Sequence, residues 1–187
     1  VDVASLTRFE KVYTKIVETP NEGAADAALD IAEAIERCVE ERGRCVIGFG
    51  AGKGVLEVYD ELVRLYFADK VSFAKVVAFN ISELGFGQQA TESQNNFRRL
   101  QERLFNKIDI DPSNVYTIDE GATKENVHRY CKQYETLIDS FGGIDLLVCQ
   151  LTKNGGLAFN EPGPQSTSSC RVVPLSNDTR QRIADTY

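Results

Sequence analysis

Short apolar runs separated by helical patterns constrain the fold of this chain more than any other feature of its sequence. The runs are almost continuously hydrophobic, which is typical of parallel strands that are buried on both faces. Parallel strands need a crossover connection, usually a helix, so the alternation predicts βαβ units. The runs are Arg44–Gly50, Phe73–Asn80, Asn114–Asp119 and Ile144–Gln150. We therefore expect a single α/β domain over residues 1–187, with a mainly parallel sheet between two layers of helices.

Helix start and stop signals lie between these runs. Thr19, Pro20 and Glu22 form a capping-box pattern before an alanine-rich helix, which is expected to end near Glu41, ahead of Gly43. Apolar spacing predicts further helices over Val55–Lys70, over Glu92–Phe105, from a cap at Thr123 to Phe141, and from a cap at Asn177 or Asp178. Weaker patterns predict two additional strands, Val12–Val17 and Cys170–Leu175.

Three loops follow predicted strands, and ligands of such folds bind at the carboxyl ends of the strands. The loops are Gly50–Gly54, Asn80–Gln89 and Leu151–Gly163. We expect all three at one edge of the sheet. The third loop is polar, yet it contains a single carboxylate, Glu161, and no histidine.

The glycine-rich turn Gly48–Gly54 resembles two phosphate-binding motifs and satisfies neither. A Walker A loop needs Ser or Thr where Gly54 stands, and the dinucleotide fingerprint needs glycine where Lys53 stands. A turn that opens a helix still presents free N–H groups and a positive dipole end to an anion, and Lys53 could add a charge. The alternative is that the glycines serve only the backbone angles of the turn.

Two other polar features have structural alternatives. Ser82 and Glu83 follow the second strand, where such a pair is more often a capping or solvated turn than a site. His128 is the only histidine, and its place in the middle of a predicted helix, beside the apolar positions, predicts a surface residue rather than a catalytic one.

Composition excludes several classes of function. The net charge of −7 argues against a nucleic-acid or anionic-membrane partner, and no apolar run is long enough to span a bilayer. The five cysteines include no C-x-x-C pair, so neither a zinc site nor a redox motif is indicated and reduced thiols are expected. We expect a cytoplasmic protein without a metal or cofactor. The absence of methionine suggests a processed chain or a fragment.

Several segments together resemble glucosamine-6-phosphate deaminase. The stretches "CVIGFGAGKGVLEVYDELVR", "VVAFNISE", "GGIDLLV" and "AFNEPG" occur in the family's order, and the resemblance runs from about Phe9 to Tyr187. It is closest to the longer bacterial deaminase-like proteins. The family implies a Rossmann-like sheet, a homo-oligomer and conversion of glucosamine 6-phosphate to fructose 6-phosphate and ammonia without a redox cofactor. The family fold also continues beyond residue 187.

The resemblance is interrupted where the family keeps its chemistry. Ser82 stands where the family has the proton-transferring Asp, and Asn154 and Gly156 stand where it has an Asp and the ring-opening His. The matching carboxylates Glu83 and Glu161 are retained.

The family's phosphate contacts are also altered. Gly52, Lys53 and Gly54 occupy the phosphate loop without its hydroxyl donors, and Asp185 aligns with a phosphate-binding Arg. The resemblance therefore implies a protein of amino-sugar metabolism that is deficient in deaminase activity and retains at most sugar-phosphate binding. Two alternatives stay open, a lactonase-like hydrolase or altered isomerase that uses Glu161 or Glu83, and a non-catalytic oligomerisation protein.

Overall fold

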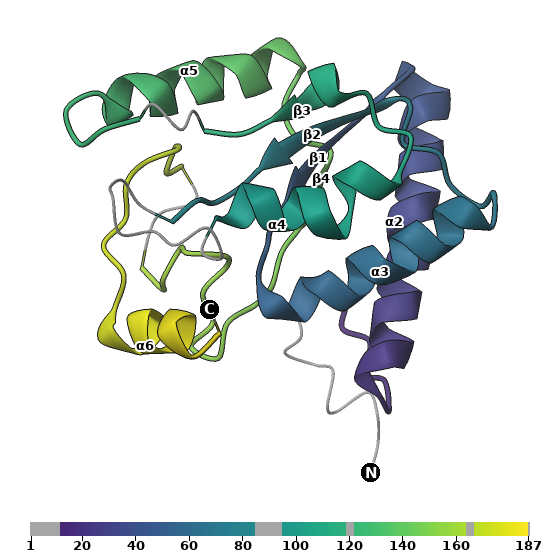
Figure 1. Ribbon diagram of the computed structural model, residues 1–187, viewed down its shortest axis with the longest axis horizontal. Coiled ribbons are helices and arrows are strands. Elements are labelled where there is room, and N and C mark those ends of the chain that lie inside the picture. Colours follow the sequence, from purple (N-terminus) through teal and green to yellow (C-terminus); the bar gives the residue numbers. More distant parts are fainter. Residues whose placement is uncertain (1–11, 85–94, 119–121, 164–166, 187) are drawn as a thin grey trace.

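A four-stranded parallel sheet forms the centre of the computed structural model, which describes residues 12–84, 95–118, 122–163 and 167–186. The strand order is β3-β2-β1-β4 (Figure 1). All pairings are parallel, and Phe49, the last residue of β1, pairs with Asn80 of β2 and Val148 of β4. The strands are β1 (Cys45–Phe49), β2 (Val76–Asn80), β3 (Val115–Tyr116) and β4 (Leu146–Val148). The predicted α/β class and the four predicted strands are confirmed.

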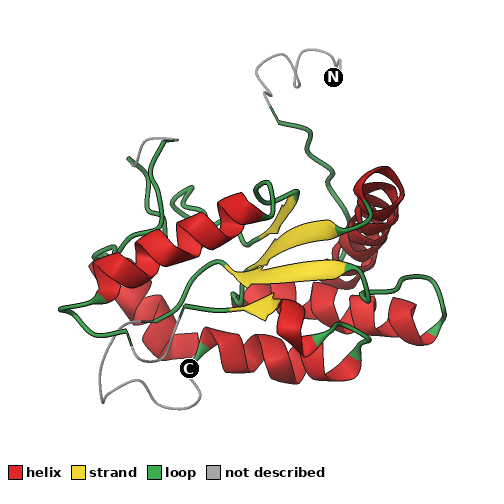
Figure 2. Cartoon of the chain, turned by 90° about the horizontal axis from the view of Figure 1, so that it is seen from above, coloured by secondary structure: helices red, strands yellow, loops and turns green. Residues whose placement is uncertain are grey.

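Helices cover both faces of this sheet (Figure 2). They are α2 (Pro20–Arg42), α3 (Lys53–Phe67), α4 (Asn96–Arg103), α5 (Val127–Ser140) and α6 (Asn177–Thr186), with short 3₁₀ helices at Phe105–Lys107 and Pro112–Asn114. The long helix α2 packs mainly against α3. The fold is therefore a three-layer sandwich, as the alternation of apolar runs and helical patterns predicts.

Alternate residues of the central strands enter different cores. Cys45, Ile47 and Phe49 of β1 join the core beneath α2 and α3, whereas Val46 joins the core beneath α5. This division follows the two-residue period of a strand, because successive side chains point to opposite faces. Both faces are apolar, so the strands read as continuous hydrophobic runs.

The local signals at the ends of α2 are confirmed. Thr19 Oγ1 accepts a hydrogen bond from the backbone N–H of Glu22, and Glu22 Oε2 accepts one from the backbone N–H of Glu18. At the other end Gly43 adopts a left-handed φ of 75°, and its N–H donates to the carbonyl oxygen of Val39. Glycine reaches this conformation without a steric penalty.

The two additional strands predicted from the sequence are wrong. Residues 12–17 form no ladder with the sheet, and Ile16 in this segment is 92% exposed. An alternating pattern creates a strand only where a neighbouring edge is free to pair, and residues 12–17 pair with none. Cys170–Leu175 likewise forms no strand, and Pro174 within it has no N–H to donate to a ladder.

Three predicted helix starts and boundaries also change. Helix α5 begins at Val127, after a turn in which Thr123 supplies its carbonyl oxygen. Helix α6 begins at Asn177, but the capping side chain is Ser176, whose Oγ accepts from the N–H of Thr179. The helix predicted from Glu92 begins at Asn96, and residues 92–94 lie outside the described residues.

Two buried tyrosines tie the helical layers to the carboxyl ends of the strands. Tyr59 of α3 donates its hydroxyl proton to the carbonyl oxygen of Gly50 at 2.5 Å. On the other face, the hydroxyl of Tyr134 of α5 lies 2.9 Å from the carbonyl oxygen of Asn80 and 3.1 Å from that of Tyr116. These bonds fix the points at which the loops leave β1, β2 and β3.

We predict that Tyr59→Phe destabilises the protein by about 1–3 kcal/mol, because it leaves a buried carbonyl oxygen without its donor. Chemical denaturation followed by circular dichroism measures the change. Tyr66→Phe, at a half-buried position on the same helix, is the matched control and should change stability much less. Equal stability of the two variants would show that the Tyr59 hydroxyl does not hold the loop.

Candidate functional site

The three candidate loops meet at one edge of the sheet. Each follows a strand of the same direction, and β1, β2 and β4 end in register at Phe49, Asn80 and Val148. Gly50 approaches β4 so closely that its N–H donates to the Val148 carbonyl oxygen at 2.8 Å. The expectation that the loops share the carboxyl edge is confirmed.

The first loop leads into the amino-terminal end of helix α3. Gly52 is the capping residue and has no side chain with which to satisfy the first N–H groups of the helix. Instead, the N–H of Gly54 donates to Oε1 of Gln150 at 3.1 Å. Lys53, the first helical residue, is exposed. The predicted anion position therefore lies at a helix start that already holds an oxygen from another loop.

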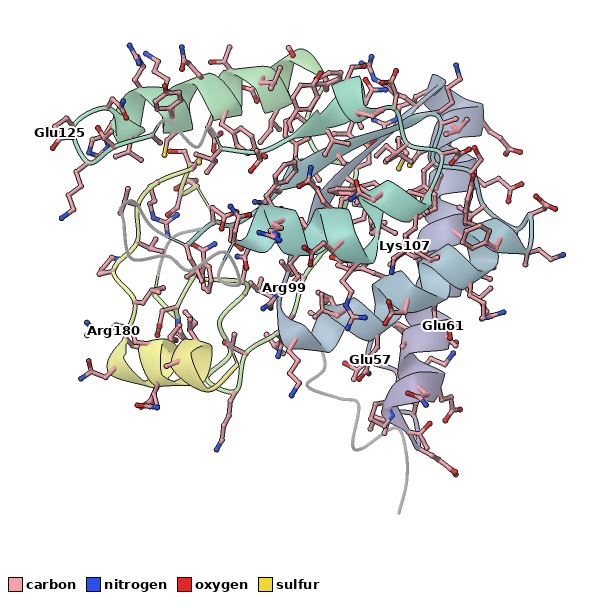
Figure 3. The ribbon with its side chains drawn as sticks, viewed as in Figure 1. Glu57, Glu61, Arg99, Lys107, Glu125 and Arg180 are labelled. Atoms are coloured by element: carbon pink, nitrogen blue, oxygen red, sulfur yellow. The ribbon has the colours of Figure 1, made fainter. Side chains whose placement is uncertain are left out.

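A cation from α4 also reaches this turn. Nη1 of Arg99 donates to the carbonyl oxygen of Ala51 at 3.3 Å, and Figure 3 shows Arg99 projecting from α4 toward the start of α3. The first loop is thus held on one side by Arg99 and on the other by Gln150.

The second loop places Glu83 at the amino end of α4. Its Oε1 accepts from the N–H groups of Leu84 and Asn96, both at 2.9 Å. Its Oε2 accepts from the N–H of Phe97 at 3.0 Å and from Nδ2 of Asn80 at 3.1 Å. Glu83 therefore acts as a cap for α4, which is the structural alternative that the sequence left open.

The neighbouring Ser82 is also tied into local structure. Its N–H donates to Oδ1 of Asn80 at 3.3 Å, and its carbonyl oxygen accepts from Nδ2 of Asn96 at 3.1 Å. The Ser82 side chain lines a cavity together with Glu83. Both candidate residues of the second loop thus lie on the same rim.

The third loop closes on itself through Asn154 and Gly156. The N–H of Thr152 donates to the carbonyl oxygen of Gly156 at 2.8 Å. Oδ1 of Asn154 accepts from the Thr152 hydroxyl at 2.6 Å and from the N–H of Gly156 at 3.3 Å. Asn154 therefore stabilises the turn that its own loop makes.

Gly156 is buried inside this turn. An added Cβ would lie 2.6 Å from the carbonyl oxygen of Asn160 and 2.8 Å from Oγ1 of Thr152. The first of these atoms is backbone, so it cannot yield without a change in the path of the loop. The observed loop has no room for a side chain at position 156.

Glu161 connects the third loop to the amino end of α6. Its Oε1 accepts from the Thr179 hydroxyl at 2.7 Å and from the N–H of Ser176 at 3.2 Å, and its Oε2 accepts from Nδ2 of Asn154 at 3.1 Å. These hydrogen bonds, from Ser176 and Thr179 foremost, lower the pKa of Glu161 to about 2. Glu161 is therefore ionised at neutral pH.

A cavity of about 730 Å³ lies beside the second and third loops. Ser82 and Glu83 line it, whereas Gly52–Gly54, Asn154 and Glu161 do not. Its walls are largely apolar and come from the end of β2, the inner face of α5, the region of β4, the third loop and the segment 168–175. They include Ile81, Ile138, Ile144, Leu147, Leu157 and Leu175. Of the candidate residues, only Ser82 and Glu83 therefore face this cavity, although residues 157–160 of the third loop also line it.

One group of potential metal ligands lies at the opposite edge of the sheet. Ligand atoms of Cys38, Cys45 and Asp145 lie within 4.8 Å of one another. The guanidinium of Arg42 pairs with Asp145, whose Oδ2 also accepts from the N–H of Val46 at 2.8 Å. Binding of a metal would require the loss of this ion pair, so the cluster gives no argument for a resident ion.

Other predictions concern the surface and the thiols. All five cysteines are free, and His128 is exposed, as expected. None of the helices in the described ranges has the length and apolar character needed to cross a membrane. Asp185 lies on α6, but its side chain is outside the described part of the chain, so its proposed place near the phosphate stays a prediction.

The contact of Gln150 and the hydrogen bonds of both retained carboxylates at helix starts were not predicted from the sequence. Gln150 contacts a residue 96 positions away in the chain, so no local pattern marks it. Glu83 precedes its partner Asn96 by 13 positions, which is far outside the spacing of a capping box. The Ser176–Thr179 pair is a local capping pattern and could have been found.

We predict that Glu161→Gln lowers the melting temperature at pH 7, because a neutral amide replaces an ionised acceptor at a helix start. The folded pKa lies below the usual value of 4.5, so the carboxylate stabilises the fold above that pH and loses this effect as pH falls toward 2. Melting curves between pH 7 and pH 2.5 should therefore converge for the two proteins. Glu40→Gln, at an exposed site on α2, is the control; a pH-independent difference for Glu161→Gln would contradict the assignment.

Comparison with known proteins identifies the family. Residues 18–156 match the sequence model of the family described as glucosamine-6-phosphate isomerases/6-phosphogluconolactonase. A glucosamine-6-phosphate deaminase-like protein of Bacteroides thetaiotaomicron is 37% identical over 183 residues, which are 97% of this chain and 27% of that protein. The glucosamine-6-phosphate deaminase of Caenorhabditis elegans is 35% identical over 90% of this chain and 62% of its own length. The chain thus spans only part of these relatives.

Solved structures agree with this assignment. A monomeric glucosamine-6-phosphate deaminase superposes with a TM-score of 0.81 at 29% identity, over 91% of this chain and 68% of that chain. The 6-phosphogluconolactonase of Trypanosoma brucei has a TM-score of 0.65 at 21% identity, over 85% of this chain and 67% of its own, and shows the shared fold. By its sequence match and its Rossmann-like fold, this chain belongs to the glucosamine-6-phosphate isomerase/6-phosphogluconolactonase family.

Proposed function

We propose that this chain is a family member deficient in deaminase activity, which retains at most the binding of a sugar phosphate at the turn Gly52–Gly54. One observation carries the proposal. Both retained carboxylates are hydrogen-bonded at helix starts: Glu83 accepts from the first N–H groups of α4, and Glu161 accepts from the N–H of the α6 cap Ser176 and from the Thr179 hydroxyl. Their lone pairs are engaged by N–H and O–H donors rather than directed at a shared reaction centre.

A deaminase of this family must move a proton between two sugar carbons and open a pyranose ring. General acid–base catalysis of such steps needs a group that exchanges protons near the working pH. Hydrogen bonds lower the pKa of Glu161 to about 2, so at neutral pH it has no proton to donate and is a weak base. The hydrogen bonds that Glu83 accepts from Asn96 and Phe97 would have to break before it could take a proton.

The substituted positions do not replace these roles. Ser82 and Asn154 are neutral, and Asn154 is engaged with Thr152 and Glu161. Gly156 has no side chain and no space for one. Loss of a single general acid or base typically reduces the rate by a factor of about 10² to 10⁴. The losses are not additive, but together they support no more than a trace of deaminase activity.

Hydrolysis of a lactone is supported less well. It would require a side chain that activates water, and the two carboxylates predicted for this role, Glu161 and Glu83, are engaged at helix starts. The likeness to lactonase structures below 25% identity concerns the fold alone. A homo-oligomer, a cytoplasmic location and a purely interacting role stay predictions.

An ammonia-release assay with glucosamine 6-phosphate tests the proposal. We expect no more than a trace of ammonia from the purified protein, while a glucosamine-6-phosphate deaminase of the family, assayed in parallel, releases it readily. Turnover comparable to that of the active enzyme would refute the proposal. It would mean that Glu83 or Glu161 leaves its helix during catalysis.

A second prediction concerns a histidine introduced at position 156, where the family has its ring-opening His. Gly156→His should not create deaminase activity and should destabilise the protein by about 1–3 kcal/mol, because the new side chain is forced against the backbone of its own loop. Thermal melting and the ammonia assay measure the two effects. Lys153→His places the same side chain at an exposed position of the loop and should leave stability nearly unchanged. A Gly156→His protein as stable as this control would show that the loop opens at little cost.

A further inference from the structure

The side chain of Gln150 covers the amino end of α3. Gln150 lies two residues after the end of β4 and is half-buried. Its Oε1 accepts from the N–H of Gly54, and an added Cβ on Gly52 would lie 2.6 Å from the same Oε1 atom. The carboxamide therefore rests directly on the glycine turn.

The glycines of the turn are what allow this contact. An added Cβ on Gly54 would lie 3.1 Å from Cδ of Gln150, closer than side chains normally approach. The absence of side chains at Gly52 and Gly54 thus allows the Gln150 side chain to pack closely against the turn. The same glycines would otherwise admit a phosphate to the free N–H groups of the helix.

We propose that Gln150 is the specificity-determining residue of this turn, because its carboxamide oxygen takes the position that an anion oxygen would occupy at the start of α3. The inference rests on the proposed function, since it concerns the same turn. A sugar phosphate must displace Gln150 before its phosphate reaches the N–H of Gly54. A neutral sugar meets no such competition, because it does not need this position.

Chemistry decides how strong the competition is. The carboxamide oxygen of Gln150 is neutral, so it gains less from the helix dipole than a phosphate dianion would. The contact is nevertheless intramolecular, so it does not depend on the concentration of a ligand. Loss of one neutral hydrogen bond corresponds to a factor of roughly 2 to 10 in an equilibrium constant. Removal of Gln150 should therefore strengthen phosphate binding by up to about tenfold.

Isothermal titration calorimetry with inorganic phosphate and with glucosamine 6-phosphate tests the proposal. Gln150→Ala should bind both roughly two- to tenfold more tightly than the wild type. Gln150→Glu should bind neither, because a carboxylate fixed at the helix start repels the phosphate, and it should melt at a higher temperature. Gln133→Ala, at an exposed site on α5, is the matched control. If Gln150→Ala does not fold, Gln150→Asn removes the contact by shortening the side chain while keeping the amide.

Two results would overturn the proposal. Equal phosphate affinity of the wild type and Gln150→Ala would show that Gln150 does not compete with the anion. A lack of phosphate binding by Gln150→Ala, Gln150→Asn and the wild type alike would show that the start of α3 is not an anion position. Neither result depends on the ammonia assay, so failure here is distinguishable from failure of the proposed loss of deaminase activity.

Discussion

The arrangement of the loops at the carboxyl edge of this sheet depends on N–H groups at helix starts, which have no acceptor within their own helix. Helices α3 and α4 begin there and α6 lies beyond the loops that leave this edge (Figure 1), and each helix start needs hydrogen-bond acceptors. Gln150 supplies one for α3, Glu83 supplies two for α4, and Glu161 supplies one for the segment that opens α6. In each case the acceptor comes from a loop outside the helix. The loops that could hold a substrate therefore also supply the hydrogen-bond acceptors at the helix starts.

This arrangement explains why the third loop is polar and yet short of acids and bases. Its polar groups bind one another: Thr152 and Asn154 close the turn, and Asn154 contacts Glu161. These hydrogen bonds hold the loop in one conformation, although Asn154 itself is exposed. A group engaged in several hydrogen bonds must also break them before it can move a proton, which is the basis of the proposed loss of activity.

The sequence predicted those parts of the fold that depend on local patterns. Apolar runs located β1, β2 and β4, and the Thr19 and Gly43 signals located both ends of α2. The strand predicted at residues 12–17 failed because pairing depends on a partner that alternation does not specify. The position of the three loops at one edge of the sheet could be predicted from the parallel direction of the strands alone. The use of Glu83 and Gln150 as caps could not be predicted, because their partners are set by how distant segments pack.

Charge distinguishes the start of α3 from the other two. The starts of α4 and α6 hold the carboxylates Glu83 and Glu161, which complement the positive ends of the helix dipoles. The start of α3 holds a neutral carboxamide, with Lys53 exposed beside it and Arg99 bonded to the carbonyl oxygen of Ala51. An incoming anion would meet negative charge at two of the three helix starts and positive charge at the third. In a chain with a net charge of −7, the proposed phosphate position at α3 is therefore the helix start with the most favourable local charge, and the acceptor there, a neutral carboxamide, is the only uncharged one of the three.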